Sequence, residues 1–182
     1  MEEPWYATLL RLWLDYFFWL RYYIYGLMLD QTGLSYAASR ALRNATDFAE
    51  FFRQFYGEPA SARLEELFKQ HVLILSEIAT TIRSGQDYSA LRETFYQNAN
   101  DIARLFAEVN PYWDEETWQG LLGARYDVEE ILISRLNKRD LEGATTLYDY
   151  GYRVVQEITS YMIEGLSRQF QLPLPTAQSP TS

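Results

Sequence analysis

The stretch that decides the fold is residues 5–29, WYATLLRLWLDYFFWLRYYIYGLML. Arg11, Asp15 and Arg21 are the charged residues in it, and apolar or aromatic side chains fill most other positions. A helix that is apolar almost all the way round must be buried on several sides. No strand pattern of any length occurs elsewhere in the chain. We therefore expect an all-α protein whose first helix is buried by its own bundle, by another molecule, or by both.

Short turn signals divide the remaining chain into helices. We expect long helices over about 4–29, 59–83, 87–109 and 140–170, and shorter ones over 35–43, 44–56, 114–123 and 127–138. Asn44 and Thr46 are predicted to break the second segment, and residues 123–126 the penultimate one. Four long helices with short connections indicate an up-and-down bundle with additional short helices. Residues 1–170 are expected to form one domain, and the Pro/Ser/Thr-rich tail 171–182 to be disordered.

Composition excludes several classes of function. The chain has 182 residues and a formal charge of -9, which argues against binding to nucleic acid or to an anionic membrane surface. It has no cysteine, which excludes disulfides, thiolate nucleophiles and zinc fingers and fits a cytoplasmic protein. The three charges within residues 5–29 make that helix a costly membrane span. The acidic start MEEPW does not resemble a signal peptide.

The single histidine, His71, lies on an apolar stripe in the middle of the segment 59–83. It could be a ligand or a proton-transfer group, or a buried neutral imidazole with one or two hydrogen bonds. Phe68 precedes it by three residues, so the Glu-x-x-His signature of di-iron bundles is absent. We favour the buried imidazole and expect no bound metal.

Other polar residues could join His71 inside the bundle. Asn98 lies on the inner stripe of the segment 87–109, with Asp101 at the edge of that stripe. Together with Tyr16 they would line a small polar cavity or form a polar layer that fixes helix register. We favour the polar layer, because no nucleophile is paired with a base. The neighbouring acids at 129–130 are predicted to face solvent.

Arg21 lies within the aromatic first helix. It could hold an anionic ligand, but an arginine in such a place more often pairs with an internal carboxylate. Asp47 and Asp101 are the expected partners. Arg43, four residues before Asp47, is predicted to form a helical ion pair with it.

An ordered set of short motifs resembles a family of uncharacterised helical proteins that many bacteria encode. The motifs are Leu12-Trp13, Trp19 with Arg21, LRN at 42–44 followed by Asp47, FYG at 55–57, QHVLI at 70–74, NANDIA at 98–103, NPYW at 110–113 and EGLSRQF at 164–170. The resemblance implies a helical bundle and no established activity. Members of that family carry histidines near three positions, which here are Tyr16, His71 and Arg125. If those histidines bind a metal in the family, the resemblance implies that this chain has lost or altered that capacity.

The aromatic side chains of the first helix exceed what one bundle face can bury. Tyrosine and tryptophan are favoured at interfaces because they combine a large apolar area with a polar edge. We therefore expect a non-enzymatic protein that acts by protein–protein association, through self-assembly of the first helix with another copy or with a protein partner. The expected interface residues are Trp5, Trp13, Phe17, Phe18, Tyr22 and Tyr25. No catalytic residue and no cofactor are expected. The alternative is a bundle that binds a small molecule or metal in a cavity among Tyr16, Arg21, His71, Asn98, Asp101 and Arg125.

Overall fold

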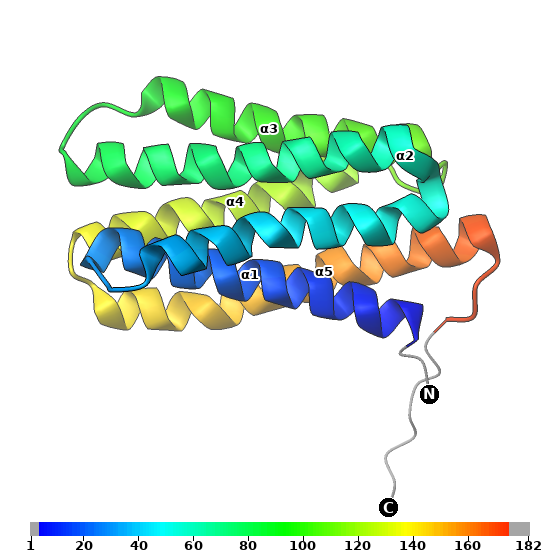
Figure 1. Ribbon diagram of the computed structural model, residues 1–182, viewed down its shortest axis with the longest axis horizontal. Coiled ribbons are helices and arrows are strands. Elements are labelled where there is room, and N and C mark those ends of the chain that lie inside the picture. Colours follow the sequence, from blue (N-terminus) through cyan, green and yellow to red (C-terminus); the bar gives the residue numbers. More distant parts are fainter. Residues whose placement is uncertain (1–3, 175–182) are drawn as a thin grey trace, which may run out of the picture.

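The computed structural model describes residues 4–174, and within them the chain forms an antiparallel bundle of five helices (Figure 1). The helices are α1 (Trp5–Leu29), α2 (Leu34–Arg83), α3 (Ser89–Val109), α4 (Glu115–Asn137) and α5 (Leu141–Phe170). The predicted all-α, up-and-down architecture is confirmed. No helix in residues 4–174 is long and apolar enough to cross a membrane.

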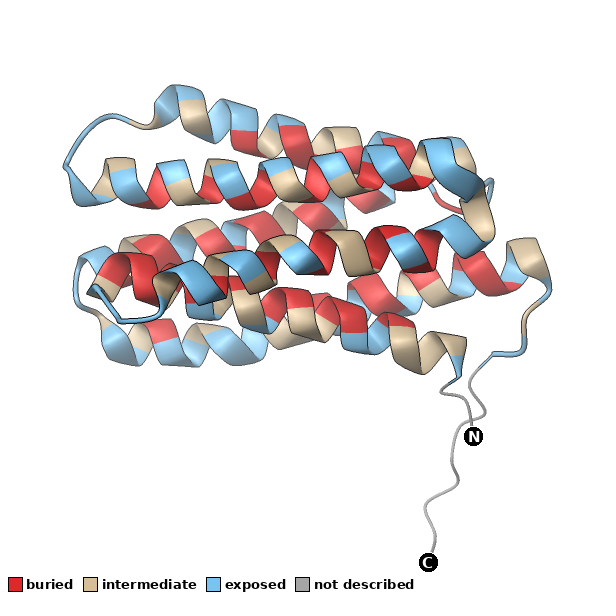
Figure 2. Ribbon diagram, in the orientation of Figure 1, coloured by how far each residue is buried: buried red, intermediate tan, exposed pale blue. Residues whose placement is uncertain are grey.

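Helix α1 has the bounds that the sequence predicts. It follows Pro4 and ends at Asp30, whose left-handed backbone (φ 54°, ψ 41°) turns the chain toward α2. It packs against α2, α4 and α5, so most of its circumference is covered by the chain's own helices (Figure 2). One outward face stays open to solvent.

Helix α2 is longer than predicted, because Asn44 and Thr46 do not interrupt it. The Asn44 side chain is buried and accepts a hydrogen bond from Arg40 one turn earlier. Thr46 donates to the Glu65 carboxylate (2.8 Å) on the other half of the helix. Asparagine and threonine are only weakly unfavourable inside helices, so packing overrides their preference.

The true break in α2 is at Gly57, where the backbone leaves the helical region (φ 75°, ψ -178°). A positive φ of this size is readily adopted by glycine and strained for other residues. Pro59 follows two residues later and begins the second half in a position that proline tolerates. The bend divides α2 into two segments, which the ribbon shows as separate rods joined by a sharp turn (Figure 1).

Aspartate side chains cap the N-termini of the last two helices. The Asp114 carboxylate accepts from the backbone N–H of Thr117 (2.7 Å), and Asp140 accepts from that of Gly143 (2.9 Å). The predicted interruption of α4 at 123–126 is wrong, because α4 runs unbroken through these residues. A single glycine costs a helix only about 1 kcal/mol, which tertiary packing outweighs.

Large aromatic side chains fill the core at the end of the bundle where α3 meets α4. Trp113 and Trp118 are both buried and meet edge to face, with ring centroids 5.7 Å apart. Gly165 on α5 leaves room for the Trp113 ring, since a Cβ at that position would lie 1.9 Å from its Nε1. The tail from 175 onward lies outside the described residues, so its predicted disorder stays a prediction.

Candidate functional site

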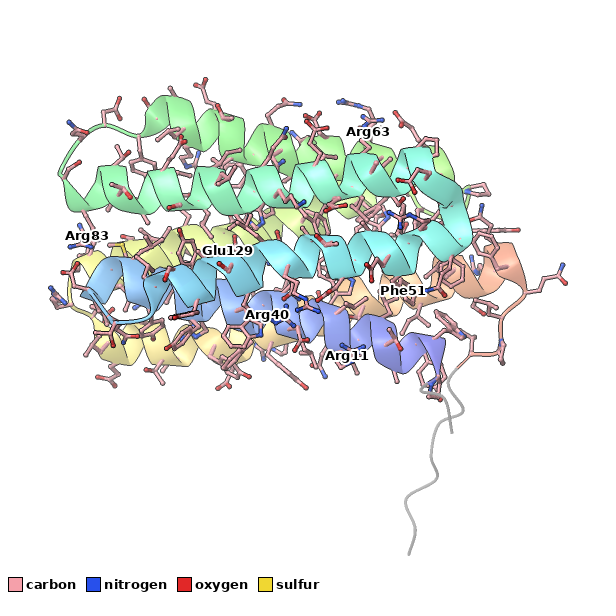
Figure 3. The ribbon with its side chains drawn as sticks, viewed as in Figure 1. Arg11, Arg40, Phe51, Arg63, Arg83 and Glu129 are labelled. Atoms are coloured by element: carbon pink, nitrogen blue, oxygen red, sulfur yellow. The ribbon has the colours of Figure 1, made fainter. Side chains whose placement is uncertain are left out.

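Four buried side chains from three helices form a connected polar cluster in the centre of the bundle. Tyr16 on α1 lies with its hydroxyl 2.6 Å from Nδ1 of His71 on α2. Nε2 of His71 lies 2.7 Å from Oε2 of Glu129 on α4. The other oxygen of Glu129 lies 3.0 Å from Nη1 of Arg125, one turn earlier on α4. Figure 3 shows Glu129 inside the bundle, between the helices.

Counting protons assigns the tautomer of His71. The Glu129 carboxylate can only accept, so Nε2 of His71 carries a proton and donates it. Nδ1 is then an acceptor for the Tyr16 hydroxyl, which lies closer to it than to the carbonyl oxygen of Phe68 (3.2 Å). In this state the cluster holds one cation, Arg125, and one anion, Glu129. It is therefore electrically neutral while the imidazole is neutral.

The electrostatic environment supports this assignment. Burial lowers the pKa of His71, and Glu129 opposes that effect only in part. Burial alone would raise the pKa of Glu129, but Arg125 and His71 hold it below its ordinary value. Burial also raises the pKa of the Tyr16 hydroxyl, which stays protonated.

A second branch extends the cluster to α3. The Tyr126 ring stacks on the imidazole of His71, with centroids 4.3 Å apart and planes inclined by 13°. Its hydroxyl donates to Oδ1 of Asn98 (2.7 Å), and the Asn98 amide donates to the carbonyl oxygen of Leu67 (3.0 Å). Through this branch the cluster touches all of the first four helices.

Arg125 is the residue of the polar cluster whose hydrogen-bonding groups are least satisfied. Nε and Nη2 have no hydrogen-bond acceptor among residues 4–174, although both are buried. Its guanidinium lies over the Tyr16 ring, 4.5 Å from the centroid, in a cation–π contact that compensates in part. The ion pair with Glu129 is therefore the main interaction that stabilises this buried charge.

The geometry permits proton sharing within the cluster but gives a substrate no access. Tyr16, His71, Arg125 and Glu129 are each at most 5% exposed. The described residues hold no group of three or more histidine, aspartate or glutamate side chains that could bind a metal. The arrangement is that of a satisfied polar layer between helices rather than a lined cavity.

The structure brings together most of the predicted site residues. Tyr16, His71 and Arg125 lie in one cluster, and Asn98 joins it through Tyr126. Asp101 does not join, because its carboxylate accepts from Gln97 and Arg104 at the surface.

Arg21 is also elsewhere, and its predicted pairing with Asp47 or Asp101 is wrong. It donates to the carbonyl oxygen of Ala144 (2.5 Å), at the start of α5. Asp47 pairs instead with Arg40 (3.5 Å) and with Arg43 (3.7 Å), and the latter is the helical pair that the sequence predicts.

Sequence reasoning missed Glu129 and Tyr126. Glu129 was expected to face solvent, yet it is buried. The signal was the spacing along α4, where the buried positions follow each other at intervals of four and three residues: Trp118, Leu122, Arg125, Glu129, Leu132 and Leu136. Arg125 and Glu129 occupy two inward positions of this stripe, which marks them as a buried pair.

The predicted interface residues divide into three groups. Trp13 and Phe17 are buried in the core of the same chain, so they are not part of the surface. Phe18 and Tyr22 are 53% and 43% exposed. Trp5 and Tyr25 are half-buried.

Comparisons of the chain with protein-family models, with curated proteins and with solved structures find no match. The assignment of a function therefore depends on the geometry of this molecule.

Proposed function

We propose that this protein acts by self-association through the outward face of α1, which we define as Leu10, Leu14, Phe18 and Tyr22. These residues follow each other at intervals of four, so their side chains lie on one side of the helix. Three of them are 38% to 53% exposed, and Leu14 is half-buried. This run of exposed apolar residues is the observation that carries the proposal.

A solvent-exposed helix face ordinarily carries charged and polar side chains. Here the aromatic surface continues sideways, because Trp19 meets Phe18 edge to face at 5.6 Å and Tyr22 at 5.9 Å. Contiguous apolar surface of this kind marks interaction sites on folded proteins. Covering it with a second copy would remove aromatic area from water at about 25 cal/mol per Å².

The central polar cluster supports this function indirectly. It fixes how α1 is rotated against α2 and α4, because Tyr16 reaches His71 only in one orientation of the helix. That rotation directs Phe18 and Tyr22 outward. The closed packing around His71 gives no comparable support to a ligand cavity at that place.

Sedimentation velocity at increasing protein concentration tests the proposal. We expect the wild-type chain to form a dimer or a larger species at micromolar concentrations. Phe18→Glu should shift it to the monomer, because the glutamate would be desolvated in the interface. Leu73→Glu is the matched control, since Leu73 is also about half exposed (55%) but lies on α2.

Two results would contradict the proposal. One is a wild-type chain that stays monomeric throughout the concentration range. The other is an assembly that Leu73→Glu disrupts as strongly as Phe18→Glu, since association would then not depend on α1.

A further inference from the structure

A groove of about 230 Å³ lies between the C-terminal half of α1 and the start of α5. Its lining residues are Phe18, Arg21, Tyr22, Tyr25, Gln31 and Tyr148. Four of the six carry aromatic rings, and one carries a positive charge. The volume lies below the usual range for drug-sized ligands, so it suits a molecule with a single ring.

Arg21 is the unusual member of this lining because no carboxylate among residues 4–174 pairs with it. Nη2 donates to the carbonyl oxygen of Ala144 (2.5 Å) and to the Tyr25 hydroxyl (3.3 Å). Nη1 is shielded from solvent and has no acceptor among residues 4–174. By contrast, Arg40 and Arg125, which are also partly or fully buried, each face a carboxylate.

The remaining contacts of Arg21 are ring faces. Its guanidinium lies 5.2 Å from the centroid of Tyr25 and 5.5 Å from that of Tyr148. Such contacts stabilise a cation but leave its hydrogen-bonding capacity unused. Burial accordingly lowers the pKa of Arg21, with the two tyrosines opposing that effect only in part.

We propose that this groove binds a small aromatic monocarboxylate, with the carboxylate on Arg21 and the ring among Phe18, Tyr22 and Tyr148. The carboxylate would give the guanidinium a charged acceptor, which the described part of the chain does not provide. The ring would pack against aromatic side chains that are otherwise open to solvent. The Gln31 amide, which also lines the groove, offers a further donor.

This inference does not require self-association, because all lining residues belong to one chain. The test is a titration of the ¹⁵N-labelled protein with phenylacetate, followed by NMR, at a concentration at which sedimentation shows the monomer. We expect saturable shifts confined to α1, the turn that follows it and the first half of α5. Phenylacetamide, which has the same shape without the charge, should bind at least tenfold more weakly.

Two variants assign the binding to Arg21. Arg21→Met should weaken phenylacetate binding at least tenfold, whereas the matched control Arg63→Met should leave it unchanged. Arg63 pairs with Glu108 at the surface and lies far from α1 (Figure 3). Because Arg21 also anchors α5, Arg21→Lys serves as a second variant that keeps the charge and should retain part of the affinity.

The proposal is overturned if phenylacetamide binds as tightly as phenylacetate, if the shifts lie elsewhere in the chain, or if no saturable binding occurs. The first comparison uses the wild-type protein alone, so it does not depend on how the variants fold. A monomeric protein that binds phenylacetate would contradict the proposed function and support this inference. A protein that self-associates but does not bind phenylacetate would support the proposed function and contradict this inference.

Discussion

Removing the charge of Glu129 should destabilise the protein strongly, because it leaves Arg125 charged and buried without a counter-ion. The substitution Glu129→Gln keeps the shape of the side chain and removes the charge that lies 3.0 Å from Arg125. Unit charges about 4 Å apart attract each other by about 4 kcal/mol at an effective dielectric constant of 20. Breaking a buried pair by removing one partner costs about 3–5 kcal/mol.

A double-mutant cycle separates this charge effect from packing. Arg125→Met alone should cost about 3–5 kcal/mol, since it leaves the buried Glu129 carboxylate without its counter-ion, although His71 still donates a hydrogen bond to it. The double variant carries neither charge, so we expect it to be about 3 kcal/mol more stable than the sum of the single effects predicts. Urea unfolding followed by circular dichroism and by tryptophan fluorescence measures each free energy of unfolding.

The pair Glu164–Arg168 on α5 provides the matched control. It has the same residue types four positions apart at 2.6 Å, but both side chains are more than half exposed. Glu164→Gln should change the free energy of unfolding by less than about 0.5 kcal/mol. The reasoning is refuted if Glu129→Gln costs no more than Glu164→Gln, or if the two effects at Arg125 and Glu129 are additive within about 0.5 kcal/mol.

Three further predictions concern pH and backbone. The free energy of unfolding should fall as the pH drops below about 6.5. The reason is that His71 binds a proton in the unfolded chain but, with its lowered pKa, stays neutral in the folded protein. His71→Gln should remove this dependence in urea titrations between pH 7 and 5. Gly165→Ala should cost about 1–3 kcal/mol through the clash with Trp113, whereas Gly120→Ala, with open space around it, should stabilise α4 by about 0.5–1 kcal/mol in thermal unfolding. Gly57→Ala should cost about 1–3 kcal/mol because φ 75° with ψ -178° is a backbone region that essentially only glycine adopts, and an unchanged melting temperature would contradict that strain.

Most of the fold could be predicted from the sequence. Pro4 marks the start of α1 and Asp140 the start of α5, and the apolar periodicity within each helix continues to its end. These are local signals. The errors arose where local preference and packing disagree. Asn44 and the glycine at 123 look like breaks in isolation, but both lie in helices whose inward faces are held by the core.

The candidate site could be predicted in part. His71 and Asn98 stood out because polar residues on apolar stripes are rare, and the structure places both in the interior. Glu129 was missed because an acidic pair on a helix usually faces water. Glu129 meets His71 because of how α4 is rotated against α2. That rotation is a property of the assembled bundle rather than of the α4 sequence.

The central cluster also constrains how the protein opens. Its contacts join α1, α2 and α4, so moving any one of these helices away exposes or unpairs a charged or polar group that the others had enclosed. Partial opening is therefore costly, and hydrogen exchange of the slowest amides in the three helices should report a single cooperative unit with a common opening free energy.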